Sequence, residues 1–184
     1  FLGNVAPELQ CQVRDRLGAR AKLVGGDTMN FWITGQPEQV RQFLARLHLL
    51  TINDSEAQLL TGEHNLYRAA RAILAMGPAA VVIKRGEHGA TLYSRSQFFG
   101  VPAYPLEDVL DPTGAGDAFA GGMLGYLARQ ERWDDASLRR AVVYGSVMGS
   151  FTCERFGVAR LVEVTPAEIE ARYQEFVALS RFEG

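Results

Sequence analysis

The sequence predicts an α/β fold in which helices cover both faces of a mostly parallel sheet. Short apolar runs rich in β-branched residues alternate with amphipathic segments, which is the pattern of buried parallel strands joined by helices. The chain has 184 residues, of which 47% are hydrophobic and 22% charged, the size and balance of one globular domain. We therefore expect a single domain over residues 1–184, built as a three-layer α/β/α sandwich.

The first half of the chain is expected to contain helices and two buried strands. The segments are a helix over 7–18, a strand over 21–27, a helix over 36–47, a strand over 48–54 and a helix over 55–62. Pro7 lies in the first turn of the first helix, and Ser55 is the expected N-cap of the last. Phe31 and Trp32, between these elements, are expected to be packing residues.

The second half continues the alternation. The segments are a helix over 66–77, a strand over 79–86, an antiparallel hairpin of 89–95 and 97–104, and helices over 115–129, 136–151 and 166–182. Ligands of parallel sheets bind beyond the carboxyl ends of the strands. Asp27, Asn53 and residues 84–86 stand at those ends. We therefore expect a ligand site along this edge of the sheet.

Composition limits the partners and the compartment. The formal net charge is −2, which gives no field that would attract nucleic acid or an anionic membrane. No apolar run approaches the ~20 residues of a membrane span, and no signal-peptide pattern is present. Cys11 and Cys153 follow no metal-ligand spacing and fit a reducing environment. These observations predict a cytoplasmic protein without a nucleic-acid or membrane partner.

The most informative stretch is DPTGAGDAFAGG, residues 111–122. Gly114, Ala115 and Gly116 place bare backbone N–H groups where a helix begins, and the positive end of the helix dipole favours a phosphoryl group there. Asp117 follows in the first turn, beside the expected anion. A carboxylate in that position is useful if it accepts a proton from a hydroxyl that attacks the phosphate. The stretch therefore predicts phosphoryl transfer with Asp117 as the base.

Other readings of this stretch are weaker. A dinucleotide fingerprint, GxGxxG, needs glycine where Phe119 stands, and a P-loop needs a lysine that is missing here. A plain tight turn into a helix remains open. Gly121, Gly122 and Gly125, further along the helix, would permit close approach of a neighbouring element or of a nucleotide.

DPTGAGDAFAGG resembles the signature D-T-x-G-A-G-D of the ribokinase-like (PfkB-type) carbohydrate kinases, with Pro112 at the usual threonine position. The matching residues are Asp111, Gly114, Ala115, Gly116 and Asp117. The resemblance implies a ribokinase-like fold, ATP and Mg²⁺ as cofactors, Asp117 as catalytic base and the amides of residues 114–117 as its anion hole. It covers the C-terminal ATP-binding and catalytic portion of such a kinase. Because the chain opens on Phe1 and lacks the family's sugar-binding motif and β lid, we expect an N-terminal portion to be missing.

Two further stretches resemble cofactor-binding motifs of the family. Asn53 and Glu56, in NDSE, resemble the N-x-x-E motif, which implies that Glu56 helps hold Mg²⁺ through water. The alternative is a helix capping box formed by the same two residues. Lys84, Gly86 and Gly89 resemble the strand and turn beside the ATP phosphates, and the alternative is a solvated strand end.

The resemblance also implies two less specific sites. Gly149 falls where the family holds its adenine pocket, although close helix packing is the more common reason for such a glycine. Asp111 and Thr113 would contribute oxygens to a monovalent-cation site if K⁺ is a cofactor.

The predicted function is transfer of the γ-phosphate of Mg·ATP to a hydroxyl of a sugar. A nucleoside (adenosine-type) kinase of the same family and a non-catalytic nucleotide-binding relative remain alternatives. A dinucleotide-dependent oxidoreductase is disfavoured by Phe119. The expected partner is a small-molecule sugar or nucleoside, and a homodimer is left open.

Overall fold

The computed structural model describes residues 1–130 and 133–181. The chain divides into two compact units, which are described separately. Unit 1 comprises Phe1–Arg85 and Thr91–Phe98, and unit 2 comprises Gly86–Ala90 and Phe99–Gly184. The expected single domain stays a prediction. The end of the last predicted helix, at Phe182, lies outside the described residues.

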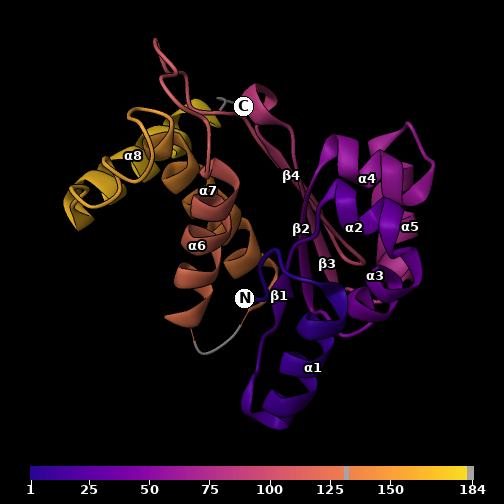
Figure 1. Ribbon diagram of the computed structural model, residues 1–184. Coiled ribbons are helices and arrows are strands. Elements are labelled where there is room, and N and C mark those ends of the chain that lie inside the picture. The colour runs from indigo at the N-terminus through magenta and orange to yellow at the C-terminus, as the bar shows by residue number, and fades with distance from the viewer. Residues whose placement is uncertain (131–132, 182–184) are drawn as a thin grey trace. The chain divides into compact units, whose positions relative to one another are not determined.

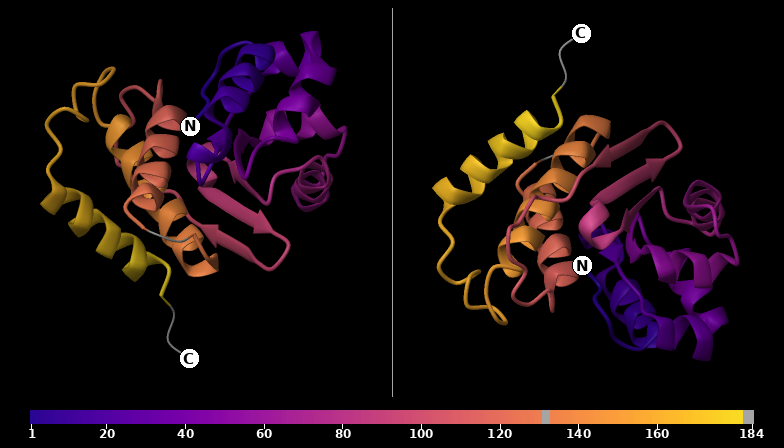
Figure 2. Two further views of the ribbon diagram at one scale, coloured as in Figure 1. Left: turned by 90° about the horizontal axis from the view of Figure 1, so that it is seen from below. Right: turned by 90° about the horizontal axis from the view of Figure 1, so that it is seen from above.

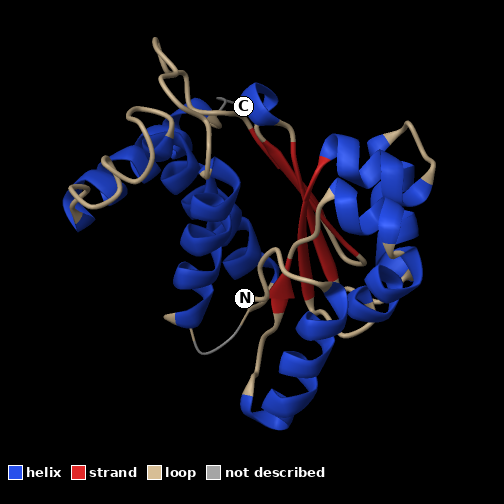
Figure 3. Cartoon of the chain, viewed as in Figure 1, coloured by secondary structure: helices blue, strands red, loops and turns tan. Residues whose placement is uncertain are grey.

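A five-stranded sheet confirms the predicted α/β class (Figure 3). Its strands are β1 (Gly25–Gly26), β2 (Leu49–Asn53), β3 (Ala80–Lys84), β4 (Ala90–Ser94) and β5 (Phe98–Val101), in the spatial order β1-β2-β3-β4-β5. The first three strands are parallel. The predicted hairpin is present, and its turn is closed by the Ser94 N–H, which donates to the Gln97 carbonyl at 2.9 Å.

Unit 1 packs its helices against the first strands. Its helices are α1 (Pro7–Leu17), the 3₁₀ turn η1 (Gly18–Arg20), α2 (Asn30–Gly35), α3 (Pro37–Leu44), α4 (Asp54–Thr61) and α5 (Leu66–Ala75). Figure 1 shows α2 to α5 along one face of β2 and β3. The core beneath them includes Val40, Phe43 and Leu44 on α3 and Ile52 and Ile83 on the strands, all fully buried. This packing fixes the carboxyl ends of β2 and β3, where two of the predicted site segments begin.

Unit 1 differs from the prediction in two places. Strand β1 has only two residues instead of the expected 21–27, because only Gly25 and Gly26 find ladder partners on β2. Helix α2 was not predicted, since six residues are too few to show a helical period. On it Phe31 is 62% exposed and is not a core residue, although its ring packs edge-on against Trp32 with 4.7 Å between the centroids. Trp32 is half-buried, and its indole N–H donates to Asn4 Oδ1 at 2.8 Å.

Unit 2 is built on three helices, α6 (Ala115–Ala128), α7 (Asp135–Thr152) and α8 (Pro166–Leu179). In both views of Figure 2, α6 and α7 lie side by side and α8 runs along α7. Stacked rings join the three: Tyr144 of α7 lies 4.7 Å from Tyr126 of α6 and 4.5 Å from Tyr173 of α8, between ring centroids. Burial, followed by a hydrogen bond to Glu170, raises the pKa of Tyr144 to about 12.

Glycines set the spacing of α6 and α7. A Cβ on Gly122 would lie 2.6 Å from Met148 Cγ and 2.7 Å from the Tyr144 carbonyl oxygen. A Cβ on Gly145 would lie 2.9 Å from the Phe119 carbonyl oxygen. The two backbones therefore meet in direct contact, which confirms the predicted close approach of a neighbouring element at Gly122. The same prediction is wrong for Gly121 and Gly125, which have no atom within 4 Å of their Cβ positions. No helix within the described residues is both long enough and apolar enough to cross a membrane.

The close packing predicts opposite effects for two neighbouring glycines of α6. Gly122→Ala is expected to be less stable than Gly121→Ala by about 1–3 kcal/mol, because its methyl group overpacks the helix contact. Gly121 has no atom within 4 Å of its Cβ position, so alanine there gains up to about 1 kcal/mol of helix propensity. Urea unfolding of both variants and the wild type measures the difference. Equal stabilities would contradict the packing described.

Candidate functional site

The start of α6 carries backbone donors that the chain itself does not use. Gly114 is the N-cap residue in the left-handed region, with φ 80° and ψ −2°. The Ala115 N–H donates to the Pro112 carbonyl at 3.1 Å, which closes the turn. Among the described residues, the N–H groups of Gly114, Gly116 and Asp117 have no hydrogen-bond acceptor. Three amides are thus available to an anion, and Ala115, which was expected among them, is not.

Asp117 places a carboxylate beside these amides. It lies in the first turn of α6 and is exposed. Within the described part of the chain it makes no hydrogen bond and no ion pair. Its oxygens are therefore unpaired and open to solvent, and its role as a base stays a prediction.

Asp111 fixes the turn that leads into α6. Its Oδ1 accepts from the Thr113 N–H at 2.9 Å, and its Oδ2 accepts from the Gly157 N–H at 3.1 Å. Hydrogen bonds from the Thr113 side chain and backbone, and then from Gly157, lower the pKa of Asp111. Both carboxylate oxygens therefore hold backbone amides, and Asp111 is first of all a residue that shapes the loop. Its role with Thr113 toward a monovalent cation stays a prediction.

In unit 1, Asn53 and Lys84 end neighbouring strands and are register partners. Asn53 is the N-cap of α4, so the expectation that Ser55 takes this position is wrong. Asn53 Oδ1 accepts from the Glu56 N–H at 2.7 Å, and Glu56 Oε2 accepts from the Asn53 N–H at 3.0 Å. Ser55 instead donates its hydroxyl to Asn53 Oδ1 at 2.8 Å. The capping box is thus present, and its presence does not remove Glu56 from the list of metal-ligand candidates.

The electrostatics of Glu56 are unusual for a capping residue. Burial raises its pKa, opposed by hydrogen bonds from Asn53 and by the nearby charge of Lys84. A partly buried carboxylate whose charged form is disfavoured gains from a cation close by. The capping role of Glu56 is thus shown by both hydrogen bonds, and its role toward Mg²⁺ stays a prediction.

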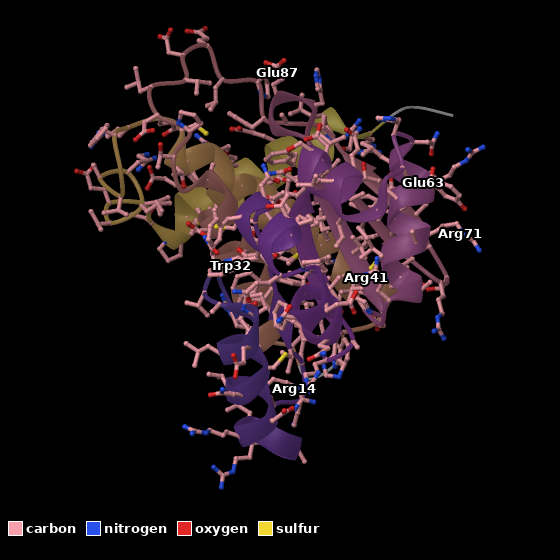
Figure 4. The ribbon with its side chains drawn as sticks, turned by 45° about the vertical axis from the view of Figure 1, so that its right-hand side comes forward. Arg14, Trp32, Arg41, Glu63, Arg71 and Glu87 are labelled. Atoms are coloured by element: carbon pink, nitrogen blue, oxygen red, sulfur yellow. The ribbon has the colours of Figure 1, made fainter. Side chains whose placement is uncertain are left out.

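The turn after β3 contains two glycines with different roles. Gly86 opens the 3₁₀ turn η2 (Gly86–His88), from which Glu87 projects (Figure 4). Gly86 has φ 52° and open space around its Cβ position. A Cβ on Gly89 would lie 2.1 Å from the Val101 carbonyl oxygen, so this glycine serves contact with the chain itself. Of the two predicted phosphate-turn glycines, Gly86 is the one that leaves room for a ligand.

Gly149 lies in a helix contact. A Cβ there would lie 3.2 Å from the Ala115 carbonyl oxygen, so α7 approaches the first residue of α6 at this glycine. The structure thus gives Gly149 a packing role next to the free amides, and its adenine-pocket role stays a prediction.

Sequence reasoning missed a group of exposed apolar side chains in unit 2. They lie on the two segments that flank Asp111 and Gly157: Val109, Leu110, Phe156, Val158 and Val162. The Leu110 N–H donates to the Cys153 carbonyl at 2.9 Å, which joins the two segments. Phe156 is 83% exposed. The sequence gives little sign of this exposed group, because its residues lie in irregular segments that show no helical or strand periodicity.

The other concavity of note is in unit 1. An open cleft of about 640 Å³ lies between α5 and the turn of the hairpin, with Tyr67, Arg71, Tyr93 and Phe98 on its walls. Arg71 projects outward from α5 (Figure 4). None of the predicted site residues lines this cleft. In residues 1–130 and 133–181, no three His, Cys, Asp or Glu side chains gather as a metal site.

Comparisons with known proteins agree with the motif. Residues 16–164 match the model of the pfkB family of carbohydrate kinases. The chain is 36% identical over 131 residues to cytidine kinase of Thermococcus kodakarensis, which covers 70% of this chain and 47% of that protein. It is 33% identical over 114 residues to aminoimidazole riboside kinase of Salmonella typhimurium, covering 62% of this chain and 35% of the relative. The chain thus matches about half or less of the length of these relatives.

Solved structures show the same similarity. The crystal structure of aminoimidazole riboside kinase from Salmonella enterica, complexed with aminoimidazole riboside and an ATP analogue, matches with a TM-score of 0.75 at 26% identity. It covers 92% of this chain and 56% of that one. A putative ribokinase II from E. coli, in complex with ATP and Mg²⁺, also matches with a TM-score of 0.75, at 25% identity over 94% of this chain and 58% of that one. The predicted ribokinase-like fold is confirmed, and the chain belongs to the pfkB family of carbohydrate kinases.

Proposed function

We propose that this chain is the ATP-binding and catalytic part of a kinase that transfers the γ-phosphate of Mg·ATP to a hydroxyl of a sugar. One observation carries the proposal: among the described residues, three backbone amides at the start of α6 have no acceptor, and the unpaired carboxylate of Asp117 stands in the same turn. Unpaired amides at a helix N-terminus fit a phosphoryl group, and the open space around Gly114 leaves room for it. The relatives named above, which are kinases, support the same chemistry.

The residues at the start of α6 have different roles in the proposed reaction. The amides of Gly114, Gly116 and Asp117 stabilise negative charge that develops on the transferring phosphoryl group. The Asp117 carboxylate accepts the proton of the attacking hydroxyl, which makes that oxygen a better nucleophile. Asp111 holds the turn rigid, so that the amides need not reorganise during the reaction. ATP, when bound with its metal, supplies the phosphoryl group.

The candidate metal and phosphate ligands are residues at and just after the carboxyl ends of β2 and β3. Glu56 would hold Mg²⁺ through water, since Mg²⁺ usually keeps several of its waters and binds through few carboxylates. Lys84, the register partner of Asn53, is the cation that would compensate phosphate charge. Gly86 is the turn residue with open space for close backbone approach.

A nucleoside is the second candidate acceptor. It is favoured by the names of the relatives, because cytidine kinase and aminoimidazole riboside kinase both act on ribosides. Burkholderia thailandensis nucleoside kinase is another structural neighbour, at 30% identity with a TM-score of 0.67. In either case the reacting group is a sugar hydroxyl, so the roles of Asp117 and the amides are the same. We also propose a cytoplasmic location, on the two unpaired cysteines.

The test is a phosphorylation screen with the complete protein. ADP release from Mg·ATP is measured with free sugars in one set and nucleosides in the other, and the product is identified by mass. Turnover with one sugar or nucleoside supports the kinase. Saturable ATP binding without turnover on any acceptor would favour the non-catalytic relative instead.

Glu56→Gln separates the capping role from the metal role. The glutamine oxygen can still accept from the Asn53 N–H, so the capping box is kept. We expect an unfolding temperature at least equal to that of the wild type. The Mg²⁺ concentration needed for half-maximal activity should rise about 10- to 100-fold, roughly the effect of losing an outer-sphere ligand. Glu56→Ala is the control that loses both roles. An unchanged Mg²⁺ requirement in Glu56→Gln would leave Glu56 as a cap only.

The same variant gives a pH test. Because burial raises the pKa of Glu56, the folded protein holds this proton to a higher pH than the unfolded chain. Between the two pKa values the folded state binds more protons, so the stability of the wild type falls as the pH rises through this window. Glu56→Gln lacks that loss. Its stability advantage in urea unfolding is therefore expected to grow with pH across the window and then level off, and an advantage independent of pH would contradict the burial effect.

A further inference from the structure

Two arginines hold one carboxylate immediately after α7. Arg172 Nη2 lies 2.5 Å from Glu154 Oε1, and Arg160 Nε lies 2.9 Å from Glu154 Oε2. Arg160 also reaches Glu168 Oε1 at 2.7 Å. The Arg172 and Arg160 side chains are only 13% and 16% exposed, and that of Glu154 is 24% exposed. The two pairs with Glu154 are thus partly shielded from solvent and differ from ordinary surface salt bridges, whereas Glu168 is more exposed.

Arg172 is the best-packed member of the cluster. Its guanidinium carbon lies 3.6 Å from the centroid of the Phe151 ring and 4.4 Å from that of Tyr104. Its Nη1 donates to Ser150 Oγ at 3.1 Å. A guanidinium that is stacked and hydrogen-bonded in this way has little freedom to move. Arg172 therefore links α8 to the end of α7 at a fixed position.

The carboxylate that Arg172 holds belongs to the segment that shapes the anion hole. Glu154 lies between Cys153, whose carbonyl accepts from the Leu110 N–H, and Gly157, whose N–H donates to Asp111 Oδ2. Asp111 in turn holds the Thr113 N–H, one residue before Gly114. A continuous series of contacts thus runs from Arg172 to the turn that opens α6.

We propose that Arg172 is a positioning residue for phosphoryl transfer. By holding Glu154 it keeps residues 153–157 in place, so that the Gly157 N–H stays on Asp111 and the turn before α6 keeps its amides converged. Arg172 touches none of the proposed reacting groups and acts through Glu154 and Asp111. The inference rests on the proposed function for its kinetic consequence, whereas the structural link can be measured without turnover.

The test compares Arg172→Met with Tyr144→Phe. Methionine keeps the length of the side chain and removes the charge and the hydrogen bonds. Tyr144→Phe removes a different contact between α7 and α8, the hydroxyl bond to Glu170 Oε2 at 3.0 Å, and touches neither Glu154 nor Asp111. Amide hydrogen exchange of Thr113 and Gly157 is followed by NMR in the complete protein without nucleotide. We expect both amides to exchange at least tenfold faster in Arg172→Met and at the wild-type rate in Tyr144→Phe.

Glu154→Gln is the second variant, in case Arg172→Met fails to fold. It keeps the shape of the side chain and weakens both arginine pairs, so it is expected to raise exchange at the same two amides. Unchanged exchange in a folded variant, or an equal rise in Tyr144→Phe, would overturn the proposal. In the kinase assay Arg172→Met should lower kcat with little change in the KM of the acceptor, and Arg172→Lys should recover part of it. If the wild type shows no turnover but Arg172→Met still speeds exchange at Thr113 and Gly157, the structural link holds. That outcome contradicts only the proposed function.

Discussion

Asp117→Asn is expected to lower kcat of the complete kinase by about 10²- to 10⁴-fold, the range that a positioned general base contributes. Asparagine has nearly the same shape but cannot take the proton of the attacking hydroxyl. The Asp117 backbone N–H is retained, so affinity for Mg·ATP should stay within about threefold of the wild type, or tighten slightly as a negative charge beside the phosphates is lost. Steady-state kinetics on the acceptor identified in the screen, with calorimetry of Mg·ATP binding, measures both quantities.

The matched control for this variant is Asp135→Asn. Asp135 also lies in the first turn of a helix of unit 2, α7, but not beside the free amides of α6. Its replacement is expected to leave kcat unchanged. Wild-type turnover in Asp117→Asn would show that another group, or none, takes the proton.

Gly114→Val is expected to lower kcat by about 10²- to 10³-fold, the effect of losing one donor of an anion hole. With φ at 80°, a β-branched residue is strongly disfavoured at this position, so the turn must change its backbone. There is no steric clash to add to this effect, because no atom lies within 4 Å of the Cβ position. The loss therefore arises from backbone conformation, and the amides of Gly114 and Gly116 cease to converge.

Gly121→Ala is the control for Gly114→Val, because it changes a glycine of the same helix that is also open around its Cβ but has no positive φ. It should keep full activity and gain a little stability. Gly114→Val with wild-type kcat and ATP affinity would show that the left-handed turn is not needed for phosphoryl transfer.

Much of the fold follows from local patterns in the sequence. The apolar stripe of α3 and the β-branched runs of β2 and β3 are strong periodic signals, and each became buried core. Strand β1 is shorter than predicted because the length of a strand depends on pairing partners elsewhere in the chain. The sequence does not show where that pairing stops. Asn53 and Ser55 are both good N-cap residues, and the point at which β2 ends and α4 begins in the folded chain makes Asn53 the cap.

The candidate site, like the fold, could be predicted from the sequence only in part. The glycines and Asp117 could be found from the sequence because their chemistry requires particular residues at adjacent positions. That the Ala115 amide closes a turn onto Pro112, leaving three donors rather than four, depends on backbone geometry that spacing does not specify. The Arg172–Glu154 pair joins residues 18 positions apart through an irregular segment, which no local pattern reveals.

The most direct test of the anion hole is an NMR titration of the complete protein with Mg·ATP that follows the backbone amides at the start of α6. The amides of Gly114, Gly116 and Asp117 should shift and become protected from exchange as the site saturates. The Ala115 amide, already bonded to the Pro112 carbonyl, should change least of the four. Saturable binding of Mg·ATP that leaves the three free amides unshifted and unprotected would contradict a phosphate site at the start of α6.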